Sequence, residues 1–486
     1  MNQVRHFLDG FFRPESVAVV GATNNPMKMN FRLMHNLVNL NFEGKIHPVN
    51  PNAREVLGLK VFPRLRDVPD RIDLVVTAVP AARTMDIVKD CDELGIKQLV
   101  IVSGGFSEGG EDGRRLHQEI ASFVKERGIR TLGPNTLSPI STANRLAISF
   151  NHIRKMKRGG LSLAFQSGFY EPRINWILSG LGVNKMLDMG NKMDITEVDA
   201  LEYFALDPDT KVIAMHVESV RGNGRSFFNA LQEVSKEKPT IILKSGRTPG
   251  GSKAAASHTG AMARENDAIF DGMIKQTAAI RAQNLEEFFD LAKAFEYLDL
   301  PQGNNLAIIM MSGGEGVMAT DACEMNGLKP ARVGDLTGGK LKQILPPWEI
   351  PLNPFDSGVC MEFHMSAPLA FLESLVAIPQ DENVDCGIMQ MPPDLFDFMS
   401  SNSEISEEVA NSFIEQFTQG IVNMQRAGKP FALWRSSMDA QEEKWIETIE
   451  SHGLPVFQSS ERAIKALAAM HKLSLRRSLS STGTGE

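Results

Sequence analysis

The sequence predicts an α/β protein with three doubly wound domains. Two observations lead to this fold class. The chain has 486 residues, which is too long for a single hydrophobic core and suggests about three domains of roughly 150 residues each. In addition, short apolar segments alternate with segments of helical periodicity along the chain. Such alternation is typical of parallel sheets that carry helices on both faces.

One local pattern opens each expected domain: a short apolar strand, a turn of small residues and then a helical segment. The three strands are Ser16–Val20, Leu161–Phe165 and Leu306–Met311. A parallel strand enters its crossover helix in this way, and amide groups at a helix start can bind anions. The other expected strands are 45–49, 74–79, 98–102, 212–217, 240–244, 386–390 and 431–434, and the expected helices are 31–38, 82–94, 113–127, a helix through 176–178, 224–236, 317–325 and 404–427.

Polar, glycine-containing stretches mark two expected domain boundaries. Residues 152–160 are basic and end in glycine, and residues 299–304 read Asp-Leu-Pro-Gln-Gly-Asn. The domains are therefore expected at 1–148, 149–300 and 301–473. The tail, 474–486, ends in Ser, Thr, Gly and Glu and is expected to be disordered.

The composition excludes several classes of protein. Hydrophobic residues make up 42% of the chain, charged residues 23%, and the net charge is -8, so nucleic-acid binding is not expected. No segment approaches the ~20 apolar residues that span a bilayer, and the start lacks an apolar signal region. Four scattered cysteines indicate reduced thiols, and no metal-ligand spacing is present. We expect a cytoplasmic protein with no membrane contact and no catalytic metal of its own.

The turns of the first domain are expected to line one crevice, because doubly wound sheets bind ligands at their carboxyl edge. Gly21-Ala22-Thr23-Asn24 differs from the Gly-x-Gly-x-x-Gly fingerprint of dinucleotide sites, and no acidic residue ends the second strand. A nicotinamide-dependent oxidoreductase is therefore disfavoured, although it stays an alternative. The turns are residues 21–23, 48–51, 78–80, 103–108 and 133–135.

Segment 253–263 carries one nucleophilic side chain, His258, among small residues. We expect a loop here, because so little bulk cannot form a core and Gly260 allows unusual backbone angles. A lone imidazole on such a loop suits transfer of a covalently bound group between two places. The alternative is an ordinary solvated loop that contains one of the ten histidines.

Taken together, these segments resemble the α subunit of the nucleoside-diphosphate-forming (ADP-forming) acyl-CoA synthetases, relatives of succinyl-CoA synthetase. The match runs in order from about residue 10 to residue 473. It implies a Rossmann-like CoA-binding domain followed by two flavodoxin-like ligase domains, the first of which carries a phosphohistidine loop. The motifs are Phe12–Ala22, Pro48–Pro51, Ser103–Glu108, Gly133–Asn135, Gln166–Gly168, Gly190–Asp194, Ser257–Ala261, Gly313–Val317 and Asn353–Asp356.

The resemblance implies that acyl-CoA, phosphate and ADP are reversibly converted to carboxylic acid, CoA and ATP. An acyl phosphate forms first, His258 takes its phosphoryl group, and the phosphohistidine passes it to ADP. A carboxylate is expected to orient the imidazole. Glu218, at the end of strand 212–217, is the best candidate; the alternative is a surface carboxylate, and Asp194 and Glu197 are weaker candidates.

Two further groups of residues are implied by the resemblance. Coenzyme A is expected at Gly21, Ala22, Thr23, Asn50, Pro51, Val79, Pro80, Ser103, Gly104, Phe106, Glu108 and Asn135. The phosphate and the acyl group are expected at Gln166, Ser167, Gly168, Gly190, Asn191 and Gly260.

The chain departs from the family at the expected phosphate site. Phe169-Tyr170-Glu171-Pro172 replaces a small-residue continuation, and Glu171 brings a negative charge near an anion site. Thr136 replaces an expected Cys, and Asp188 replaces an expected Ser before Gly190. These changes either reshape the acyl pocket or indicate a degraded phosphate site. The second possibility gives the alternative function, a non-catalytic CoA-binding scaffold homologue.

No segment resembles an ATP-grasp domain, and the glycine-rich stretch 312–316 lacks the lysine of a nucleotide phosphate loop. ATP or ADP and Mg²⁺ are therefore expected on an ATP-grasp β subunit, in a hetero-oligomer of the α2β2 type. The other substrate is a small carboxylic acid or its acyl-CoA. The sequence leaves open which acid is used, the physiological direction, and whether ADP or GDP is the acceptor.

Overall fold

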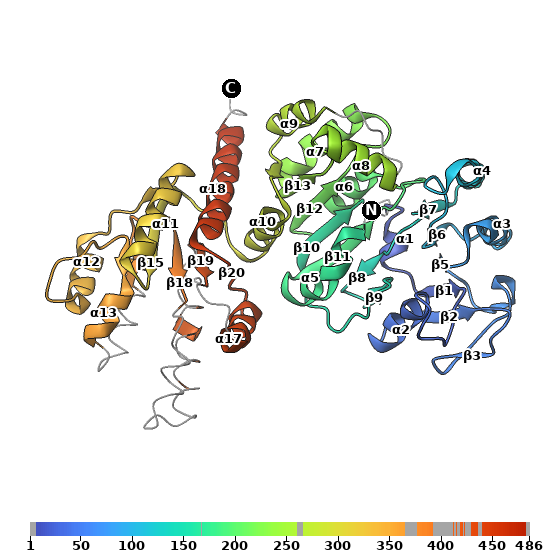
Figure 1. Ribbon diagram of the computed structural model, residues 1–486, viewed down its shortest axis with the longest axis horizontal. Helices are drawn as coiled ribbons and strands as arrows, with labels where there is room; N and C mark the ends of the chain where they lie inside the picture. The colour runs from blue at the N-terminus through green and yellow to red at the C-terminus, as the bar shows by residue number, and fades with distance from the viewer. Residues whose placement is uncertain are drawn as a thin grey trace. The chain divides into compact units, whose positions relative to one another are not determined.

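The computed structural model describes residues 6–166, 168–259, 266–364, 377–391, 412, 415, 418–420, 422, 429–435 and 440–482. Its contacts divide the chain into two compact units, Met1–Phe288 and Phe289–Glu486. The first unit contains two large sheets, and the second contains one (Figure 1). The helix expected at 404–427 falls mostly outside the described residues.

The first sheet is parallel, with the strand order β2-β1-β5-β6-β7. The chain runs from β1 to β2 on one side and returns to β5 on the other, so the winding direction reverses at β1. This confirms the doubly wound fold, in which ligands usually bind at the carboxyl ends of the strands, beside such a reversal. The elements are α1 (Asp9–Phe12), β1 (Ser16–Val20), α2 (Phe31–Asn39), β2 (Lys45–Val49), β3 (Glu55–Val56), β4 (Leu59–Lys60), β5 (Leu74–Thr77), α3 (Thr84–Glu93), β6 (Gln98–Ile101), α4 (Gly110–Arg127) and β7 (Arg130–Leu132).

The second sheet has the order β14-β13-β12-β10-β11-β8-β9. Strands β10 to β14 are parallel, whereas β8 runs antiparallel to β11 and forms a hairpin with β9. Since β8 begins at Ile140, this sheet starts before the boundary expected at 148. The elements are β8 (Ile140–Ser141), β9 (Leu146–Ala147), β10 (Arg158–Phe165), α5 (Ile174–Gly180), β11 (Val183–Asp188), α6 (Glu197–Leu206), β12 (Val212–Val217), α7 (Gly224–Glu237), β13 (Thr240–Lys244), α8 (Pro249–Thr259), α9 (Asp267–Lys275) and β14 (Ile280–Ala282).

Helix α8 corrects the expectation of a loop at 253–263, because it extends to Thr259. Its sequence explains the difference. Pro249 stands at the first helical position, where its missing N–H group costs nothing, and Ala254–Ala256 have the highest helix propensity. Residues 260–265 lie outside the described part of the chain.

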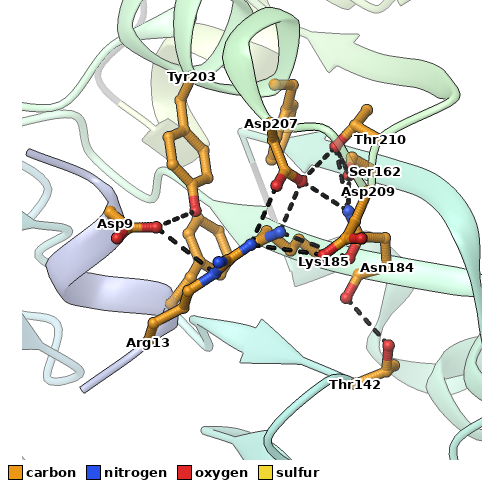
Figure 2. Close-up of polar contacts among 12 residues, drawn as sticks. Asp9, Arg13, Thr142, Ser162, Asn184, Lys185, Tyr203, Asp207, Asp209 and Thr210 are labelled. Carbon is orange, nitrogen blue, oxygen red and sulfur yellow. Dashed lines mark hydrogen bonds and ion pairs between the residues drawn. The ribbon is translucent and has the colours of Figure 1, made fainter. Parts of the chain in front are cut away.

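A buried polar network anchors the N-terminal segment to the amino end of the second sheet (Figure 2). The Lys185 ammonium donates to the Asp207 carboxylate at 2.6 Å, and both side chains are almost fully buried. Asn184 and Thr210 donate to the same carboxylate at 2.7 and 2.6 Å, and Arg13, just after α1, reaches it at 3.3 Å. Buried charges need such full hydrogen bonding to be tolerated.

The second unit holds a sheet of order β16-β15-β18-β19-β20, with β17 beside β15. All of its pairings are parallel, as expected for a third doubly wound domain. The elements are α10 (Leu285–Tyr297, shared with the first unit), β15 (Asn305–Met310), α11 (Gly313–Met325), β16 (Lys329–Pro330), α12 (Asp335–Leu341), β17 (Phe355–Asp356), α13 (Ser357–His364), β18 (Cys386–Gln390), β19 (Phe431–Trp434), α17 (Ala440–Ser451), β20 (Val456–Phe457) and α18 (Ser460–Thr482).

Helix α18 corrects the expectation of a disordered tail from residue 474, because it continues to Thr482. The helix is anchored by buried Leu467, Met470 and Leu473, and adding residues to an existing helix is much easier than nucleating one. Neither α18 nor another helix in the described part of the chain is long and apolar enough to cross a membrane.

Candidate functional site

The first two expected turns lie side by side at the carboxyl edge of the first sheet. The Gly21 N–H group donates to the carbonyl that ends β2 at 2.9 Å. The Asn50 side chain donates to the Ala22 carbonyl at 2.7 Å, so Asn50 uses this donor to join the two turns. Thr23 is half-buried and Pro51 is exposed next to them.

The later turns continue the same edge. The Ser103 hydroxyl donates to the Val79 carbonyl, and the Asn135 N–H group donates to the Ser103 carbonyl at 3.0 Å. The Gly105 N–H group donates to the Glu108 carboxylate at 2.8 Å. The turns after β1, β2, β5, β6 and β7 thus form one continuous edge. Its exposed members are Pro51, Pro80, Gly104, Glu108 and Asn135.

The glycines of this edge let neighbouring turns pack closely, because a side chain at either of two positions would be crowded. A Cβ atom on Gly21 would lie 3.3 Å from the Ala78 carbonyl oxygen, and one on Gly104 would lie 3.0 Å from a Glu108 oxygen. Gly21 and Gly105 also adopt φ of +92° and +97°, a conformation that favours glycine. A backbone this bare allows the close approach that phosphate-bearing ligands need. The edge therefore fits an extended ligand such as coenzyme A.

Two residues expected to touch that ligand, Ala22 and Phe106, have fully buried side chains. Phe106 packs in the core of the first sheet with Ile101 and Ile120. The sequence could not separate it from its exposed neighbours, because a turn of small residues carries no burial pattern. Both side chains therefore pack beneath the edge, and the binding of the coenzyme at these two residues stays a prediction.

Asn191 joins this edge to the second sheet. Its side chain donates to Glu108 Oε2 at 2.5 Å, and its N–H group donates to the Pro134 carbonyl at 2.9 Å. Gly190 makes this approach possible, because a Cβ atom there would lie 2.3 Å from the Pro134 oxygen. Asn191 is 8% exposed, and its Oδ1 atom has no hydrogen-bond partner among the described residues. The expected coenzyme residues and the expected phosphate residues are thus in direct contact.

The Asp188 carboxylate is hydrogen-bonded to two backbone N–H groups next to the contact between Asn191 and Glu108. It accepts hydrogen bonds from the N–H groups of Leu137 and Gly190, both at 3.0 Å. Burial raises the pKa of Asp188 to about 7, although these two hydrogen bonds act in the opposite direction. Gly190 was expected at the phosphate and acyl site, and its N–H group is bonded to Asp188 within the protein.

Two of the side chains that replace the family's small residues, those of Tyr170 and Glu171, turn inward. The Tyr170 ring is buried and stacks on Phe165, with 4.4 Å between the ring centroids. The Glu171 carboxylate accepts from the Ser149 hydroxyl at 3.2 Å and from the Asn151 amide. Burial raises the pKa of Glu171, which the same hydrogen bonds partly oppose. The negative charge expected beside an anion site is therefore directed into the protein.

The segment after Gln166 forms a short 3₁₀ helix, Gly168–Arg173, before α5 begins. The sequence predicted that one helix would open there. Pro172 explains the difference, because it has no N–H group to donate within a helix. Gly168 is exposed. Ser167 and the side chain of Phe169 lie outside the described residues.

Glu218 follows β12 directly and is half-buried. The Gln166 Oε1 atom accepts hydrogen bonds from the N–H groups of Glu218 and Ser219 at 2.8 and 2.9 Å. The Lys244 ammonium donates to the Glu218 carbonyl at 2.7 Å. Gln166 was expected to contact phosphate, whereas its side chain holds the backbone of this turn.

Helix α8 packs beside the same turn. The Ser252 hydroxyl donates to the Gly246 carbonyl at 2.7 Å. A Cβ atom on Gly246 would lie 3.8 Å from the Ala255 Cβ atom and 3.9 Å from the Glu218 carbonyl oxygen. His258 belongs to the end of α8, but its side chain and Gly260 lie outside the described residues.

Three basic residues at this edge were missed by sequence reasoning, the buried Lys192 and Lys244 and the exposed Arg221. Lys192 forms an ion pair with Glu197 at 2.5 Å, Lys244 ends β13, and Arg221 donates to the Asn191 carbonyl at 3.1 Å. The position of each lysine was a usable signal. A charged residue inside a glycine-rich motif or at the end of an apolar strand is buried only when it has partners.

Asp194 and His216 take part in packing. Asp194 pairs with Arg130 at 2.7 Å. The His216 ring bonds the Ser245 hydroxyl at 2.5 Å, and burial lowers the pKa of His216 to about 3, so the ring is neutral near neutral pH. Within the described ranges, no group of three or more His, Cys, Asp and Glu side chains could hold a metal ion.

Comparisons with known proteins match both sheets of the first unit. Residues 15–139 match the family model of a CoA binding domain, and residues 158–295 match that of a succinyl-CoA ligase like flavodoxin domain. The chain is 34% identical over 477 residues to the α subunit of acetate–CoA ligase [ADP-forming] I from Pyrococcus furiosus, covering 96% of this chain and 98% of the relative. It is also 34% identical to acetate–CoA ligase [ADP-forming] II from Archaeoglobus fulgidus, covering 97% of this chain and 67% of the relative.

A solved structure agrees with these relatives. The dinucleotide-forming acetyl-coenzyme A synthetase 1 from Ca. Korarchaeum cryptofilum, solved in complex with phosphate and ADP, is 28% identical to this chain. The two folds superpose with a TM-score of 0.83, and the match covers 99% of both chains.

Proposed function

This chain belongs to the family of ADP-forming acetate–CoA ligases, and we propose that it is the α subunit of an acid–thiol ligase that interconverts acyl-CoA, phosphate and ADP with carboxylic acid, CoA and ATP. The contact between Asn191 and Glu108 carries this proposal. It joins the edge that fits coenzyme A to the edge of the second sheet, where Glu218 and α8 lie. A thioester held along the first edge would thus end near the second.

The proposed reaction passes through two covalent intermediates. Phosphate attacks the thioester carbonyl, the C–S bond breaks, and CoA leaves as the thiolate while an acyl phosphate forms. An imidazole nitrogen of His258 then attacks phosphorus, and the carboxylate leaves as the P–O bond breaks. The phosphohistidine finally gives its phosphoryl group to ADP. Dividing a difficult transfer into easier steps is the advantage of covalent catalysis.

Glu218 is the proposed orienting residue for His258. A carboxylate that accepts a hydrogen bond from the second imidazole nitrogen selects the reactive tautomer and stabilises the positive ring that forms. Two observations support this role. Glu218 stands at the carboxyl edge of the sheet. A Cβ atom placed on Gly246 would lie within 4 Å of both the Glu218 carbonyl oxygen and the Ala255 Cβ atom of α8.

Coenzyme A is proposed to lie along the edge of the first sheet, where it supplies the thiol. Gly21 and Gly104 carry no side chain that could cover the main chain, so the phosphates and amides of the coenzyme would come close to the backbone there. Glu108 and Asn135 are exposed on the same edge. The unpartnered Oδ1 atom of Asn191 would accept a hydrogen bond from the ligand.

The proposed partner is an ATP-grasp β subunit that binds ATP or ADP with Mg²⁺, in an α2β2 assembly. The Pyrococcus furiosus relative is named as an α subunit. The Archaeoglobus fulgidus relative is longer, and this chain spans 67% of it. We propose that the end of α8 carries the phosphoryl group between the acyl site and the nucleotide site.

The test uses the chain co-expressed with an ATP-grasp β subunit. A panel of acyl-CoA thioesters is supplied with phosphate, ADP and Mg²⁺, and ATP formation is followed. We expect ATP with at least one thioester and loss of nearly all activity in His258→Ala. His452→Ala, which removes an exposed histidine of the second unit, is the matched control. Full activity of His258→Ala would refute the phosphohistidine step.

One observation favours a second candidate, the CoA-binding scaffold without phosphate chemistry. Asp188 accepts the Gly190 N–H group, so one residue expected at the phosphate site already uses its backbone donor within the protein. Under this alternative, CoA binds, but acyl-CoA and phosphate never yield free thiol, even when the partner is present. Phosphate-dependent release of CoA therefore separates the two functions.

A further inference from the structure

All four backbone polar groups of Glu218 and Ser219 are bonded to buried side chains. Their two N–H groups donate to Gln166 Oε1. The Glu218 carbonyl accepts from Lys244 at 2.7 Å, and the Ser219 carbonyl accepts from Lys192 at 2.6 Å. We call Gln166, Lys192 and Lys244 the clamp.

The members of the clamp come from three different strand ends. Gln166 follows β10, Lys192 lies in the turn after β11, and Lys244 is the last residue of β13. Each is at most 4% exposed. Since β10 and β13 flank β12 and β11 flanks β10, the clamp holds the end of β12 from both sides.

Holding the end of a strand with these three side chains costs free energy. Two ammonium groups must leave water, which costs free energy that only good hydrogen bonds offset. The two lysines donate to the main-chain carbonyls of two adjacent residues. Water or a simple turn could satisfy these carbonyls equally well if the position of the turn did not matter. The arrangement therefore indicates that the orientation of this one turn is important.

We propose that Gln166, Lys192 and Lys244 are positioning residues, which hold the backbone of Glu218 so that its carboxylate meets the imidazole of His258. This inference rests on the proposed function. Gly246 separates the clamp from α8, with the Glu218 oxygen and the Ala255 Cβ atom both within 4 Å of a Cβ atom placed there. A displacement of about 1 Å at a reacting group lowers a rate by about a hundredfold, so a small rotation of the turn would matter.

Lys244→Met tests the clamp best, because removal of Lys192 would also leave the buried Glu197 carboxylate without its ion pair. The matched control is Lys238→Met. Lys238 also donates to two main-chain carbonyls, those of Phe204 and Asp207 at 2.8 and 2.7 Å. It precedes β13, at the opposite end of the strand from Lys244.

Two half-reactions of the complex with the β subunit are measured. In Lys244→Met, labelling of the chain by radioactive phosphate from ATP is expected to slow about tenfold to a hundredfold. Phosphate-dependent release of thiol from acyl-CoA, which precedes the action of His258, is expected to stay near the wild-type rate. Lys244→Arg, which keeps a cationic donor, should restore part of the labelling rate. Lys238→Met should label at the wild-type rate.

The outcomes separate the clamp from the function on which it rests. Absence of label in the wild-type complex refutes the phosphohistidine function and the clamp with it. Normal labelling of both the wild type and Lys244→Met refutes the clamp alone, as does an equal slowing of both half-reactions. If Lys244→Met does not fold, Lys244→Gln, whose shorter neutral side chain lacks the charge and the reach of the ammonium group, replaces it, and the same split is required of it.

Discussion

The Asn191 amide donates a 2.5 Å hydrogen bond to the Glu108 carboxylate, although the two residues lie in turns that follow strands of different sheets. Glu108 also accepts the Gly105 N–H group with its other oxygen. The carboxylate therefore ties the edge of the first sheet to the turn after β11. If coenzyme A lies along this edge, the tie determines how its thiol end meets the second sheet.

Asn191→Ala is expected to weaken CoA binding about tenfold. The variant loses a hydrogen bond to a charged acceptor, which is worth about 1.5 kcal/mol. Isothermal titration of the chain with CoA measures the effect. Asn304→Ala, which removes an amide donor to the Gly327 carbonyl in the second unit, is the control. Equal affinity in the wild type and Asn191→Ala would mean that the tie does not shape the ligand edge.

Gly190→Ala is expected to destabilise the first unit by about 3 kcal/mol. A Cβ atom at this position would lie 2.3 Å from the Pro134 oxygen, which forces the two turns apart, and φ is +54°, which adds about 1 kcal/mol. Gly222→Ala separates the two causes, because Gly222 has φ +83° but open space around it. Chemical unfolding measures both variants, and equal losses would show that steric overlap contributes nothing.

The sequence predicts the long strands well because their burial leaves a clear signal. Residues 17–20 and 212–215 are continuous apolar runs, and both lie in strands that are buried throughout. β11 gave no such signal, since it reads Val-Asn-Lys-Met-Leu-Asp and is nevertheless fully buried. Its polar residues find partners far away in the chain, as Lys185 does in Asp207. A local pattern cannot show such compensation.

The candidate site could likewise be predicted from the sequence only in part. The strand order of a parallel sheet brings its turns to one edge, so the residues of that edge follow from the sequence. The hydrogen-bond partner of each side chain does not follow from the sequence. Gln166 bonds the backbone of Glu218, which is 52 residues away, and Asp188 bonds Leu137, which is 51 residues away. These assignments depend on how loops pack against each other, which no periodicity records.

Asp188 is expected to make stability depend on pH. Burial raises the pKa of Asp188 from 3.8 to about 7 in the folded protein, so the folded state binds its proton more tightly than the unfolded state does. Its contribution to stability is therefore fully present below about pH 4 and is lost as the pH rises to about 7. The total loss is up to about 4 kcal/mol.

Urea unfolding of the wild type and of Asp188→Asn between about pH 4.5 and about pH 7.5 checks this effect. The free energy of unfolding of the wild type should fall relative to that of the variant as the pH rises. The variant itself is expected to be less stable at low pH, because its NH₂ group would face one of the N–H donors of Leu137 and Gly190. Parallel curves for the two proteins would contradict a proton bound at Asp188.

Lys185→Met is expected to destabilise the first unit by about 3–5 kcal/mol, because it leaves the buried Asp207 carboxylate with only the half-exposed Arg13 guanidinium at 3.3 Å as its cation (Figure 2). The double variant Lys185→Met/Asp207→Leu should lose less than the single variant, since no uncompensated charge then remains. Lys45→Met, which breaks the exposed pair with Asp70, should change little. Thermal unfolding ranks the three. A double variant less stable than Lys185→Met would show that the network stabilises the fold by more than mutual neutralisation, through the bonds that Asn184 and Thr210 make to Asp207.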